Sequence, residues 1–579
     1  MKKLAMRTVK GVAALLPKSL KLALKKNTRL TEMYSTGIRK SGLFYGVPSK
    51  KEQSSRYRSL LKHQRAELAK KIDTASNEPY ACNVVFFGGK LTNVDNTMAS
   101  LKKAGIDVVQ YVGVFIESED SNSSVRVFNT TSSACESFKA EIPVLLINSG
   151  DTVDPALGVL CANHTDKALL YFDTDYVDKY GRYSEPRFSP DWNPDLQLTT
   201  AYINNGVVIA SNLIRSLNLC KCDSIASVVA HIALNAPDIS AHHIPHTVIH
   251  SNKHSVDNKI HVSSVASWLK QTNEHLAVSS ETGLTNNILW PLENKPLVSL
   301  IIPTKDGKEL VKACIDSIIE KSLYDNYEIL LIDNDSTEPE SLEYFEFLTS
   351  QPKISILKFP GPFNYSAINN FGVKHAKGDI IGLVNNDIEV INPLWLDYMV
   401  GHAMRDNVGC VGAKLLYSDG RIQHAGVVLG YGGGAGHAHK YFPRNHQGYM
   451  SRLAATQSYS AVTAACLLVK KSLFDKVGGL DEKNLAVAFN DVDFCLRIKE
   501  LDKHNIYCAE AELYHHESVS RGLDIAPEKA ARFNRELTYL QSRWAGVIAH
   551  DPAYNPNLTL RSENFAIKEE REYISTSGI

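Results

Sequence analysis

Residues 378–389 decide the fold of this chain, and they read Gly378-Asp-Ile-Ile-Gly-Leu-Val-Asn-Asn-Asp-Ile-Glu389. A short apolar run ends here in amide and acidic side chains, which is the pattern of a buried parallel strand. Such a strand delivers Asn385, Asn386, Asp387 and Glu389 to its carboxyl end, where open α/β sheets bind their ligands. Oxygen ligands at this place favour a divalent cation and the phosphates that it carries. A solvated turn is the alternative interpretation of Asn-Asn-Asp taken alone.

Strands of the same kind flank this stretch. Apolar runs at 298–302, 328–332, 354–359 and 380–384 alternate with helical patterns at 309–320, 341–348 and 365–376. The alternation predicts a doubly wound, mostly parallel sheet whose strand ends bring Asp306, Asp333 and Asp387 to one crevice. The segment 303–307 lacks the G-x-G-x-x-G fingerprint of a dehydrogenase, and the sequence contains no P-loop pattern. We therefore expect a nucleotide diphosphate bound through a metal ion, as in a transferase with a nucleotide-activated donor.

The first half of the chain repeats this organisation. Strands are predicted at 82–87, 108–115, 144–147 and 169–172. The third ends in Asn148-Ser-Gly-Asp151, which parallels Asn385-Asn-Asp387, and the fourth leads into Asp173 and Asp175. These similarities predict an internal duplication. The expected organisation is a basic helical arm (1–75), a first copy (80–260), a linker region (261–296), a second copy (297–550) and a C-terminal tail (551–579).

Charge is distributed unevenly, although the formal net charge is zero. Residues 1–71 hold 19 Lys and Arg against 3 Glu, so this segment carries about +16 and the rest of the chain about −16. Leu16, Leu20 and Leu24 form an apolar stripe in it that fits an anionic membrane surface. The alternative is a basic arm that packs on the chain's own acidic body or is simply solvated.

Composition argues against several classes of protein. The ten cysteines include no CxxC pair, so a reduced cytosolic protein is favoured over a disulfide framework or a zinc site. No run of about 18 apolar residues is present, and the 11–16 stretch is too short for a membrane span or a convincing signal peptide. We expect a cytoplasmic protein, peripheral at the inner face of the cytoplasmic membrane through residues 1–40, with no nucleic-acid partner.

Seven segments give the second copy a specific resemblance. They are Val298-Ser-Leu-Ile-Ile-Pro-Thr304, Ile332-Asp-Asn-Asp-Ser-Thr337, Asn364-Tyr-Ser-Ala-Ile-Asn-Asn370, Leu383-Val-Asn-Asn-Asp387, Val477-Gly-Gly-Leu-Asp-Glu482, Asn490-Asp-Val-Asp-Phe-Cys-Leu-Arg497 and Tyr514-His-His-Glu-Ser518. In this order they resemble the family 2 inverting glycosyltransferases. Gln423-His-Ala-Gly426 and Asp551-Pro-Ala-Tyr-Asn-Pro-Asn-Leu558 are similar to bacterial members that build surface polysaccharides, including rhamnosyltransferase-like enzymes. The resemblance implies two tandem GT-A-like α/β domains, the first of them degenerate.

The resemblance also implies a role for each matched side chain. The implied binding site for a nucleotide-sugar donor of the UDP or dTDP type consists of Thr304, Asp306, Asp333, Asn364, Asn385, Asn386 and Arg521. The implied ligands of a divalent cation, Mn²⁺ or Mg²⁺, are Asp387 and His515. Asp491 is implied as the catalytic base, and Gln423, His424, His437, Asn490 and Asp493 as acceptor or flap residues. The chain departs from the family where Asn385 and Asn490 replace acidic residues, and the lost charge at Asn385 is expected to weaken metal binding.

Each role has a structural alternative. Asp491 heads a helical pattern, where Asp is a favoured N-cap. A histidine pair such as His515 and His516 is usually at the surface or in the core. Arg521 suits either a phosphate or a salt bridge at the rim. The glycine-rich stretch 430–439 predicts a mobile flap over donor or acceptor, or only a surface connection.

The leading hypothesis is inverting transfer of one sugar from a nucleotide donor to a growing glycan or lipid-linked acceptor in bacterial surface polysaccharide synthesis. A carboxylate removes the proton of the acceptor hydroxyl as its oxygen attacks C1, and the cation absorbs the charge of the leaving diphosphate. The competing hypothesis is a catalytically inactive subunit that binds nucleotide sugar or glycan. In the first copy no acidic pair heads a helix, so Asp223 is the remaining candidate base and a scaffold or acceptor-binding role is the alternative.

Overall fold

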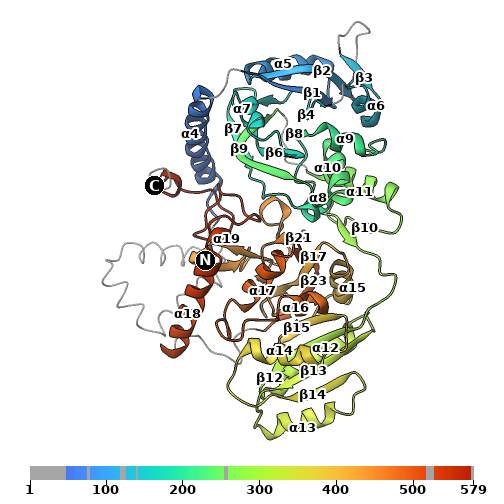
Figure 1. The fold of residues 1–579 in the computed structure, drawn as a ribbon, viewed down its shortest axis with the longest axis vertical. Helices are drawn as coiled ribbons and strands as arrows, with labels where there is room; N and C mark the ends of the chain where they lie inside the picture. Colours follow the sequence, from blue (N-terminus) through green and yellow to red (C-terminus); the bar gives the residue numbers. More distant parts are fainter. Residues whose placement is uncertain are drawn as a thin grey trace, which may run out of the picture.

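The computed structural model describes residues 47–74, 78–117, 125–138, 141–252, 258–516 and 527–574. These residues form two α/β domains that follow one another along the long axis of the molecule, drawn blue to green and yellow to red (Figure 1). The first is built on a nine-stranded sheet and the second on a ten-stranded sheet. The predicted α/β class with two sheet domains is confirmed.

The first sheet consists of strands β1 to β9. They are β1 (Tyr80–Phe87), β2 (Ile106–Val114), β3 (Arg126–Phe128), β4 (Val144–Asn148), β5 (Thr152–Val153), β6 (Leu169–Val177), β7 (Tyr183–Arg187), β8 (Val207–Ile209) and β9 (Ala241–Ser251). Their order in space is β3-β2-β1-β4-β8-β6-β9-β5, with β7 paired to β6. The helices are α5 (Val94–Lys103), α6 (Thr131–Glu136), α7 (Leu157–Ala162), α8 (Pro194–Thr200), α9 (Ser211–Ser216), α10 (Ile225–Asn235) and α11 (Lys259–Thr272).

The second sheet has the order β14-β13-β12-β15-β22-β17-β23-β16, with β18 paired to β17 and β21 to β23. Its strands are β12 (Val298–Thr304), β13 (Tyr327–Asp333), β14 (Ile354–Lys358), β15 (Ile380–Val384), β16 (Ile388–Val390), β17 (Val408–Leu416), β18 (Ile422–His424), β21 (Gln457–Tyr459), β22 (Cys466–Lys470) and β23 (His504–His515). The helices are α12 (Lys308–Lys321), α13 (Pro339–Leu348), α14 (Tyr365–His375), α15 (Trp395–Ala403), α16 (Lys471–Lys476), α17 (Asn490–Lys499), α18 (Pro527–Arg543), α19 (Ala545–Ala549) and α20 (Glu570–Ile574).

The two sheets have the same topology, strand for strand. Replacing β1 to β9, in chain order, by β12 to β18, β22 and β23 converts the first strand order into the second. The direction of each pairing is also repeated, from the parallel block β3-β2-β1-β4 to the antiparallel edge strand β5. The second copy adds β21 and the hairpin of β19 (Val427–Leu429) and β20 (Ala435–His437). The predicted internal duplication is confirmed.

Strand β15 lies at the centre of the second sheet, as its apolar sequence predicts. It is buried along its whole length, parallel to β12 and antiparallel to β22. A Cβ atom on Gly382 would lie 2.6 Å from Leu300 Cδ2 and 2.9 Å from Leu468 Cδ2, so the neighbouring side chains leave room only for glycine. The strand ends at Val384, which places Asn385 to Asp387 at its carboxyl end.

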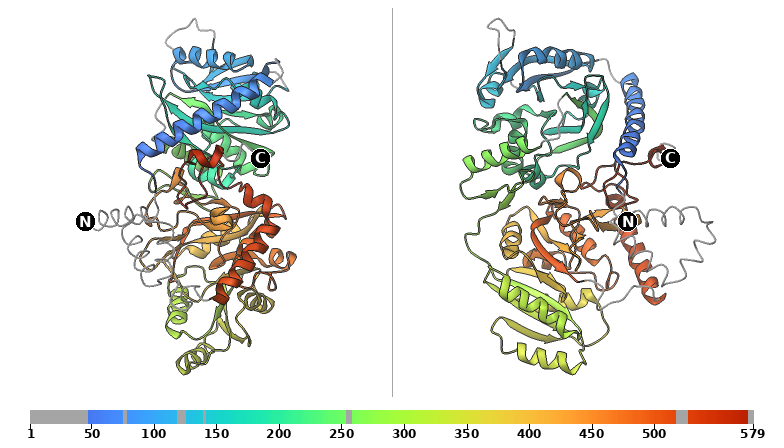
Figure 2. Two further views of the ribbon diagram at one scale, coloured as in Figure 1. Left: turned by 90° about the vertical axis from the view of Figure 1, so that its left-hand side faces the viewer. Right: turned by 180° about the vertical axis from the view of Figure 1, so that it is seen from behind.

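Helix α4 (Lys50–Thr74) lies along the side of the first domain (Figure 2). It buries Tyr57, Leu60, Leu61 and Leu68, and Arg56 Nη2 lies 3.0 Å from Glu569 Oε1. For this part of the predicted arm, packing on the chain's own body is therefore the correct alternative. The stripe Leu16, Leu20 and Leu24 lies outside the described residues, so its membrane contact stays a prediction. In the described part of the chain, no helix is long and apolar enough to cross a membrane.

The predicted linker region is mostly folded, which is a correction. Helix α11 packs on α10 and buries Val262, Val265, Trp268 and Leu269, and β10 (Ala277–Ser279) pairs with β11 (Asn287–Leu289). The sequence did not predict α11, although its apolar residues recur at helical spacing, because no side chain caps its N-terminus and its start is therefore not marked. The connection between the copies is reduced to about residues 290–297.

Candidate active site

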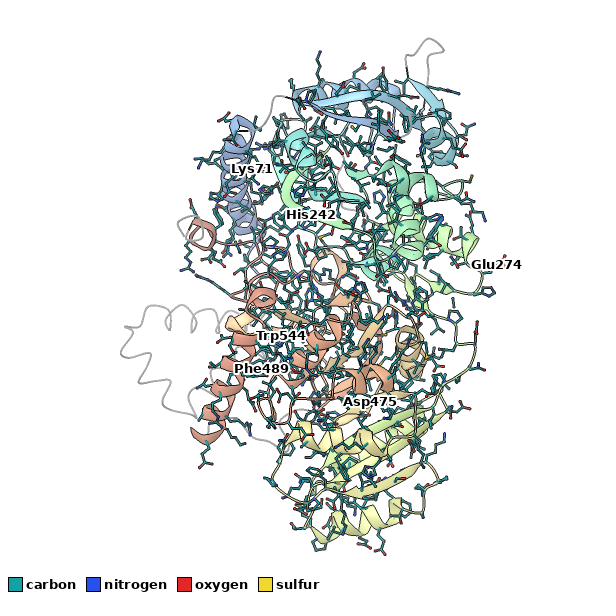
Figure 3. All side chains as sticks on the ribbon, in the orientation of Figure 1. Lys71, His242, Glu274, Asp475, Phe489 and Trp544 are labelled. Carbon is teal, nitrogen blue, oxygen red and sulfur yellow. The ribbon has the colours of Figure 1, made fainter. Side chains whose placement is uncertain are left out.

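A cavity of about 420 Å³ opens beside the start of α17 in the second domain. Six of the predicted site residues line it, from five different parts of the chain: Asn385, Gln423, His437, Asn490, Asp491 and His515. Its volume lies within the range of small-molecule sites in proteins. Phe489, labelled in Figure 3, forms part of its wall. The tertiary structure therefore brings the predicted base, metal-site and flap residues together.

Two paired strands bring Asp387 and His515 into contact. β16 begins directly after Asp387, and the register of β16 on β23 places Ile388 opposite His515. His515 Nε2 lies 3.1 Å from Asp387 Oδ1 and 3.1 Å from Asn385 Nδ2. His515 Nδ1 lies 2.6 Å from Gln423 Oε1. An amide oxygen only accepts hydrogen bonds, so Nδ1 carries a proton and donates it to Gln423.

This arrangement fits a divalent cation. When the His515 ring is neutral and donates from Nδ1, its Nε2 lone pair faces the negatively charged Asp387 carboxylate and the two repel each other. A cation bound between His515 and Asp387 would remove this repulsion. A metal-binding histidine ordinarily donates its other N–H to an oxygen that orients the ring, and Gln423 provides this oxygen. The described residues contain no group of three or more His, Cys, Asp and Glu that could hold a metal ion. The remaining ligands would therefore come from phosphates and water, as is usual for cations that carry a nucleotide.

Of the two neighbouring histidines, His515 lines the cavity and His516 does not. His516 Nδ1 lies 2.8 Å from Ser418 Oγ, and its Nε2 lies 3.2 Å from Glu389 Oε2. Glu389 also pairs with Lys321 Nζ at 3.0 Å. These residues form a polar network beside the site, and none of them lines the cavity.

Asp491 lies in the first turn of α17, facing the cavity. The residue before the helix is Phe489, which has φ of +59°, so the N-cap position belongs to Phe489 and the N-cap alternative for Asp491 does not hold. Asp491 Oδ2 accepts the Ala464 N–H at 3.2 Å, and Oδ1 accepts the Val492 N–H at 2.9 Å. Burial raises the pKa of the Asp491 carboxyl above its ordinary 3.8, against these hydrogen bonds. A carboxylate with a raised pKa is a stronger base, which suits proton abstraction.

His424 and His437 form a coupled pair with defined tautomers. Their Nδ1 atoms lie 2.8 Å apart, and His424 Nε2 accepts the Gly426 N–H at 3.3 Å. His424 therefore carries its proton on Nδ1 and donates it to His437, which leaves the proton of a neutral His437 on Nε2. Burial lowers the pKa of His424 to about 3, and the nearby His515 adds to this shift. His437 thus presents a fixed N–H donor in the wall of the cavity.

A second cluster of predicted residues lies at the ends of β12 and β13. Thr304 and Asp333 are opposite one another in these parallel strands, and Asn386 Nδ2 donates to Thr304 Oγ1 at 3.0 Å. Asp306 Oδ1 accepts the backbone N–H groups of residues 337 and 338 at 2.6 and 2.8 Å. Asn386 connects this end to Asn385 and Asp387, although none of the cluster lines the cavity. Its contact with a nucleotide stays a prediction.

Two predicted residues in the described part of the chain, Asn364 and Asp493, do not join either cluster. Asn364 caps α14 with its Oδ1 and donates from Nδ2 to the carbonyl of residue 482 at 3.0 Å. Asp493 is fully buried, and its carboxylate accepts Arg497 Nε at 2.8 Å and Trp544 Nε1 at 2.9 Å. The acceptor or flap role of Asp493 is therefore corrected, because it anchors the end of α18, where Figure 3 labels Trp544. Arg521 lies outside the described residues.

The glycine-rich stretch 430–439 is a hairpin and not an irregular loop, which corrects the predicted form of the flap. β19 and β20 pair in antiparallel register, with Val427 opposite His437. Glycines at 430, 432 and 433 have positive φ, which closes the turn between the strands. Ala435, Gly436 and His437 line the cavity, so the hairpin forms one of its walls.

The lining residues that sequence reasoning missed include Lys440, Phe533 and Glu563. Lys440 follows the hairpin, Phe533 comes from α18, and Glu563 belongs to the C-terminal tail. The resemblance covered the tail only to Leu558, so no sequence signal identified Glu563.

The first copy has counterparts of the cation-site residues but not their geometry. β5 begins directly after Asp151, and Thr152 pairs with His250, as Ile388 pairs with His515. The Asp151 carboxylate accepts hydrogen bonds from Asn205 Nδ2 at 2.6 Å and Asn252 N at 2.9 Å. His250 Nδ1 instead lies 2.7 Å from Asp175 Oδ1.

The first copy also has no carboxylate where the base is expected. α10 corresponds to α17 by its place before β9, and its second residue is Ala226. Asp223 precedes this helix and accepts the hydroxyl groups of Ser227 and Ser264. These observations favour a scaffold over a second active site.

The cavity beside α17 brings the carboxylate of Asp491 and the imidazole of His515 together at one end of an α/β sheet. Residues 299–478 match glycosyl transferase family 2. This segment, from β12 to just beyond α16, is a family 2 glycosyltransferase domain, as the resemblance implied. Asp491, His515 and Glu563 lie C-terminal to the matched residues.

Two relatives extend the comparison beyond this domain. The uncharacterized protein y4gI of Sinorhizobium fredii is 40% identical over 460 residues, which are 75% of this chain and 50% of that protein. The O-antigen biosynthesis protein RfbC of Myxococcus xanthus is 33% identical over 424 residues, which are 70% of this chain and 32% of that protein. This chain spans half or less of the length of these relatives.

Among solved structures, the mannosyltransferase PcManGT of Pyrobaculum calidifontis, in complex with GDP-Man and Mn²⁺, is 15% identical with a TM-score of 0.32. The match covers 43% of this chain and 66% of that chain. A likeness at this level carries no argument about the ligands of this chain.

Proposed function

We propose that this chain transfers a sugar from a nucleotide-sugar donor to a glycan or lipid-linked acceptor in bacterial surface polysaccharide synthesis, with inversion at C1. The observation that carries the proposal is the meeting of Asp491 and His515 in one cavity, in a chain with a family 2 glycosyltransferase domain. The name of the Myxococcus relative supports the O-antigen or capsule-like pathway class.

The chain's own residues divide the reaction between them. Asp491 takes the proton of the acceptor hydroxyl as that oxygen attacks C1 from the face opposite the leaving group. The Ala464 and Val492 N–H groups orient the Asp491 carboxylate. Thr304, Asp333 and Asn386 hold the nucleotide at the ends of β12, β13 and β15. A divalent cation held by Asp387 and His515 would neutralise the charge that develops on the diphosphate.

Asn385 and His437 complete the proposed donor site. The amide nitrogen of Asn385 lies 3.1 Å from His515 Nε2, which places this side chain beside the proposed cation position. The Nε2–H of His437 is a fixed donor for a sugar oxygen, because the His424 contact occupies Nδ1. Attachment at the inner face of the cytoplasmic membrane through residues 1–40 remains part of the proposal, supported by their basic composition.

The test uses the full chain with UDP-glucose, dTDP-L-rhamnose and GDP-mannose as donors and octyl glycosides as acceptors, with Mn²⁺, Mg²⁺ or EDTA. We expect product with one donor, loss of product in EDTA, and an inverted anomeric configuration by NMR. Asp387→Ala should abolish cation-dependent nucleotide binding, whereas Asp379→Ala, an exposed residue beside the same strand, should not. Nucleotide binding without hydrolysis or transfer across a wider donor panel would instead identify an inactive binding subunit.

A further inference from the structure

Residues 557–568 of the tail form a closed antiparallel loop. Leu558 bridges to Ile567, and Thr559 N donates to Ala566 O at 2.8 Å. Near the tip, Phe565 stacks on His439 with ring centroids 4.4 Å apart and an interplanar angle of 15°. The His439 N–H donates to the Glu563 carbonyl at 3.1 Å. The tip is therefore fixed against the segment that follows the β19–β20 hairpin.

This loop places the Glu563 side chain in the catalytic cavity. A Cβ atom on Gly436 would lie 3.0 Å from Glu563 Oε1, so the carboxylate packs closely against β20. Lys440 lines the same cavity. Among the residues that the structure describes, neither the Glu563 carboxylate nor the Lys440 ammonium makes a hydrogen bond or ion pair. Burial raises the pKa of the Glu563 carboxyl, the nearby Lys440 ammonium opposes this shift, and Lys440 Nζ also lies 5.4 Å from the centroid of the Tyr441 ring.

The first domain holds the loop in this position. Asn555 Nδ2 donates to Asp173 Oδ1 at 3.0 Å, and Asn557 Nδ2 donates to Asp173 Oδ2 at 3.0 Å. Asp173 lies on β6 and is itself paired with His243 Nε2 at 2.9 Å. Gln64 of α4 donates to Asn557 Oδ1 at 3.1 Å. The base of the loop is therefore attached to the degenerate copy, and its tip reaches the active copy.

We propose that Glu563 binds hydroxyl groups of the acceptor sugar, and that the first domain acts as the anchor that keeps Glu563 in the cavity. This inference rests on the proposed glycosyltransferase function. A carboxylate accepts two adjacent hydroxyl groups well and repels a phosphate, so Glu563 suits the acceptor better than the donor diphosphate. The acceptor must also reach Asp491, which lines the same cavity. The ligand class is a neutral sugar with free vicinal hydroxyl groups.

The first test compares Glu563→Gln with Glu570→Gln, an exposed tail residue of the same type outside the cavity. Glu563→Gln should lower kcat/KM for the glycoside acceptor by roughly 10- to 100-fold, since bonds to an ionised acceptor are lost. Hydrolysis of the donor without acceptor should be unchanged. Equal acceptor kinetics in both variants, or an equal loss of donor hydrolysis in Glu563→Gln, would overturn the assignment.

Binding provides a readout that does not depend on turnover. Saturation-transfer NMR with octyl glucoside, octyl rhamnoside and octyl N-acetylglucosaminide, in the presence of UDP, should show contact with the wild-type chain and not with Glu563→Gln. Signals of equal size in both proteins, or signals only from an octyl glucuronide added as an anionic probe, would refute the neutral-sugar site. Absence of turnover alongside this binding difference would contradict the proposed function and leave the sugar site standing.

The anchor is tested by a double-mutant cycle of Asn557→Ala and Glu563→Gln. Asn557 acts as a positioning residue, so Asn557→Ala alone should raise the acceptor KM about tenfold with little change in donor hydrolysis. In the Glu563→Gln background its further effect should fall below about twofold, because the group that it positions is already lost. Additive effects in the double variant would show that Asn557 has only a structural role.

Discussion

Asp491→Asn is the most direct test of the mechanism, because it removes the proton acceptor and keeps the size of the side chain. The remaining oxygen can still accept one of the two backbone N–H groups, from Ala464 or Val492, that the carboxylate accepts at 3.2 and 2.9 Å. Loss of a general base typically slows a reaction by about 10² to 10⁴. This corresponds to about 3 to 5 kcal/mol of transition-state stabilisation.

Stability should change little in this variant. Burial disfavours the ionised form of Asp491, as its raised pKa shows, so neutralisation relieves a cost at pH 7. The hydrogen bond that the amide group cannot accept is worth roughly 1 kcal/mol and opposes this gain. A thermal unfolding curve close to that of the wild type should therefore accompany the loss of transfer.

The assay measures acceptor transfer, nucleotide affinity and the pH profile together. Wild-type kcat/KM should fall tenfold per pH unit below the pKa of Asp491, which burial raises above 3.8, and should be flat above it. Asp491→Asn should keep its nucleotide Kd and lose this acidic limb. Unimpaired turnover, or a low-activity profile that retains the same limb, would show that another group is the base.

The remaining predictions concern the cation, the N-terminal helix and the domain anchor. Gln423→Ala should weaken Mn²⁺ or Mg²⁺ activation about 10- to 100-fold, since His515 loses the group that orients its ring, and cation titrations of activity will check this. Deletion of residues 1–75 should unfold the first domain in thermal melting curves, because each buried leucine of α4 is worth roughly 2 to 5 kcal/mol. Burial lowers the pKa of His243, but the Asp173 and Asp191 carboxylates outweigh this effect and raise the pKa to about 9. The stability that the protonated His243 contributes should therefore be complete below pH 6.5 and lost as pH rises through 9. Unfolding curves of His243→Gln should lack this loss of stability at high pH.

The sequence identified the elements whose signals are local. The apolar run 380–384 and its polar ending predicted a central strand with ligands at its carboxyl end, because strand burial and strand termination are both encoded in neighbouring residues. The repeated order of strands and acidic endings predicted the duplication, and the topology of both sheets confirms it. The prediction failed where a pattern has two local solutions, as at 430–439, where glycines allow both an irregular loop and the hairpin that the pairing of β19 and β20 selects.

The tertiary structure decided which of these groups share a site. Gln423 accepts a hydrogen bond from His515, which lies 92 positions away in the sequence, and Asn557 donates one to Asp173, which lies 384 positions away. Local sequence does not encode such contacts, because they depend on strand register and on how the chain returns from one domain to the other. The sequence therefore identified Asp491 as a candidate base, and Asp387 and His515 as candidate cation ligands. It did not identify Glu563, because the position of Glu563 in the cavity depends on a C-terminal tail that contacts both domains.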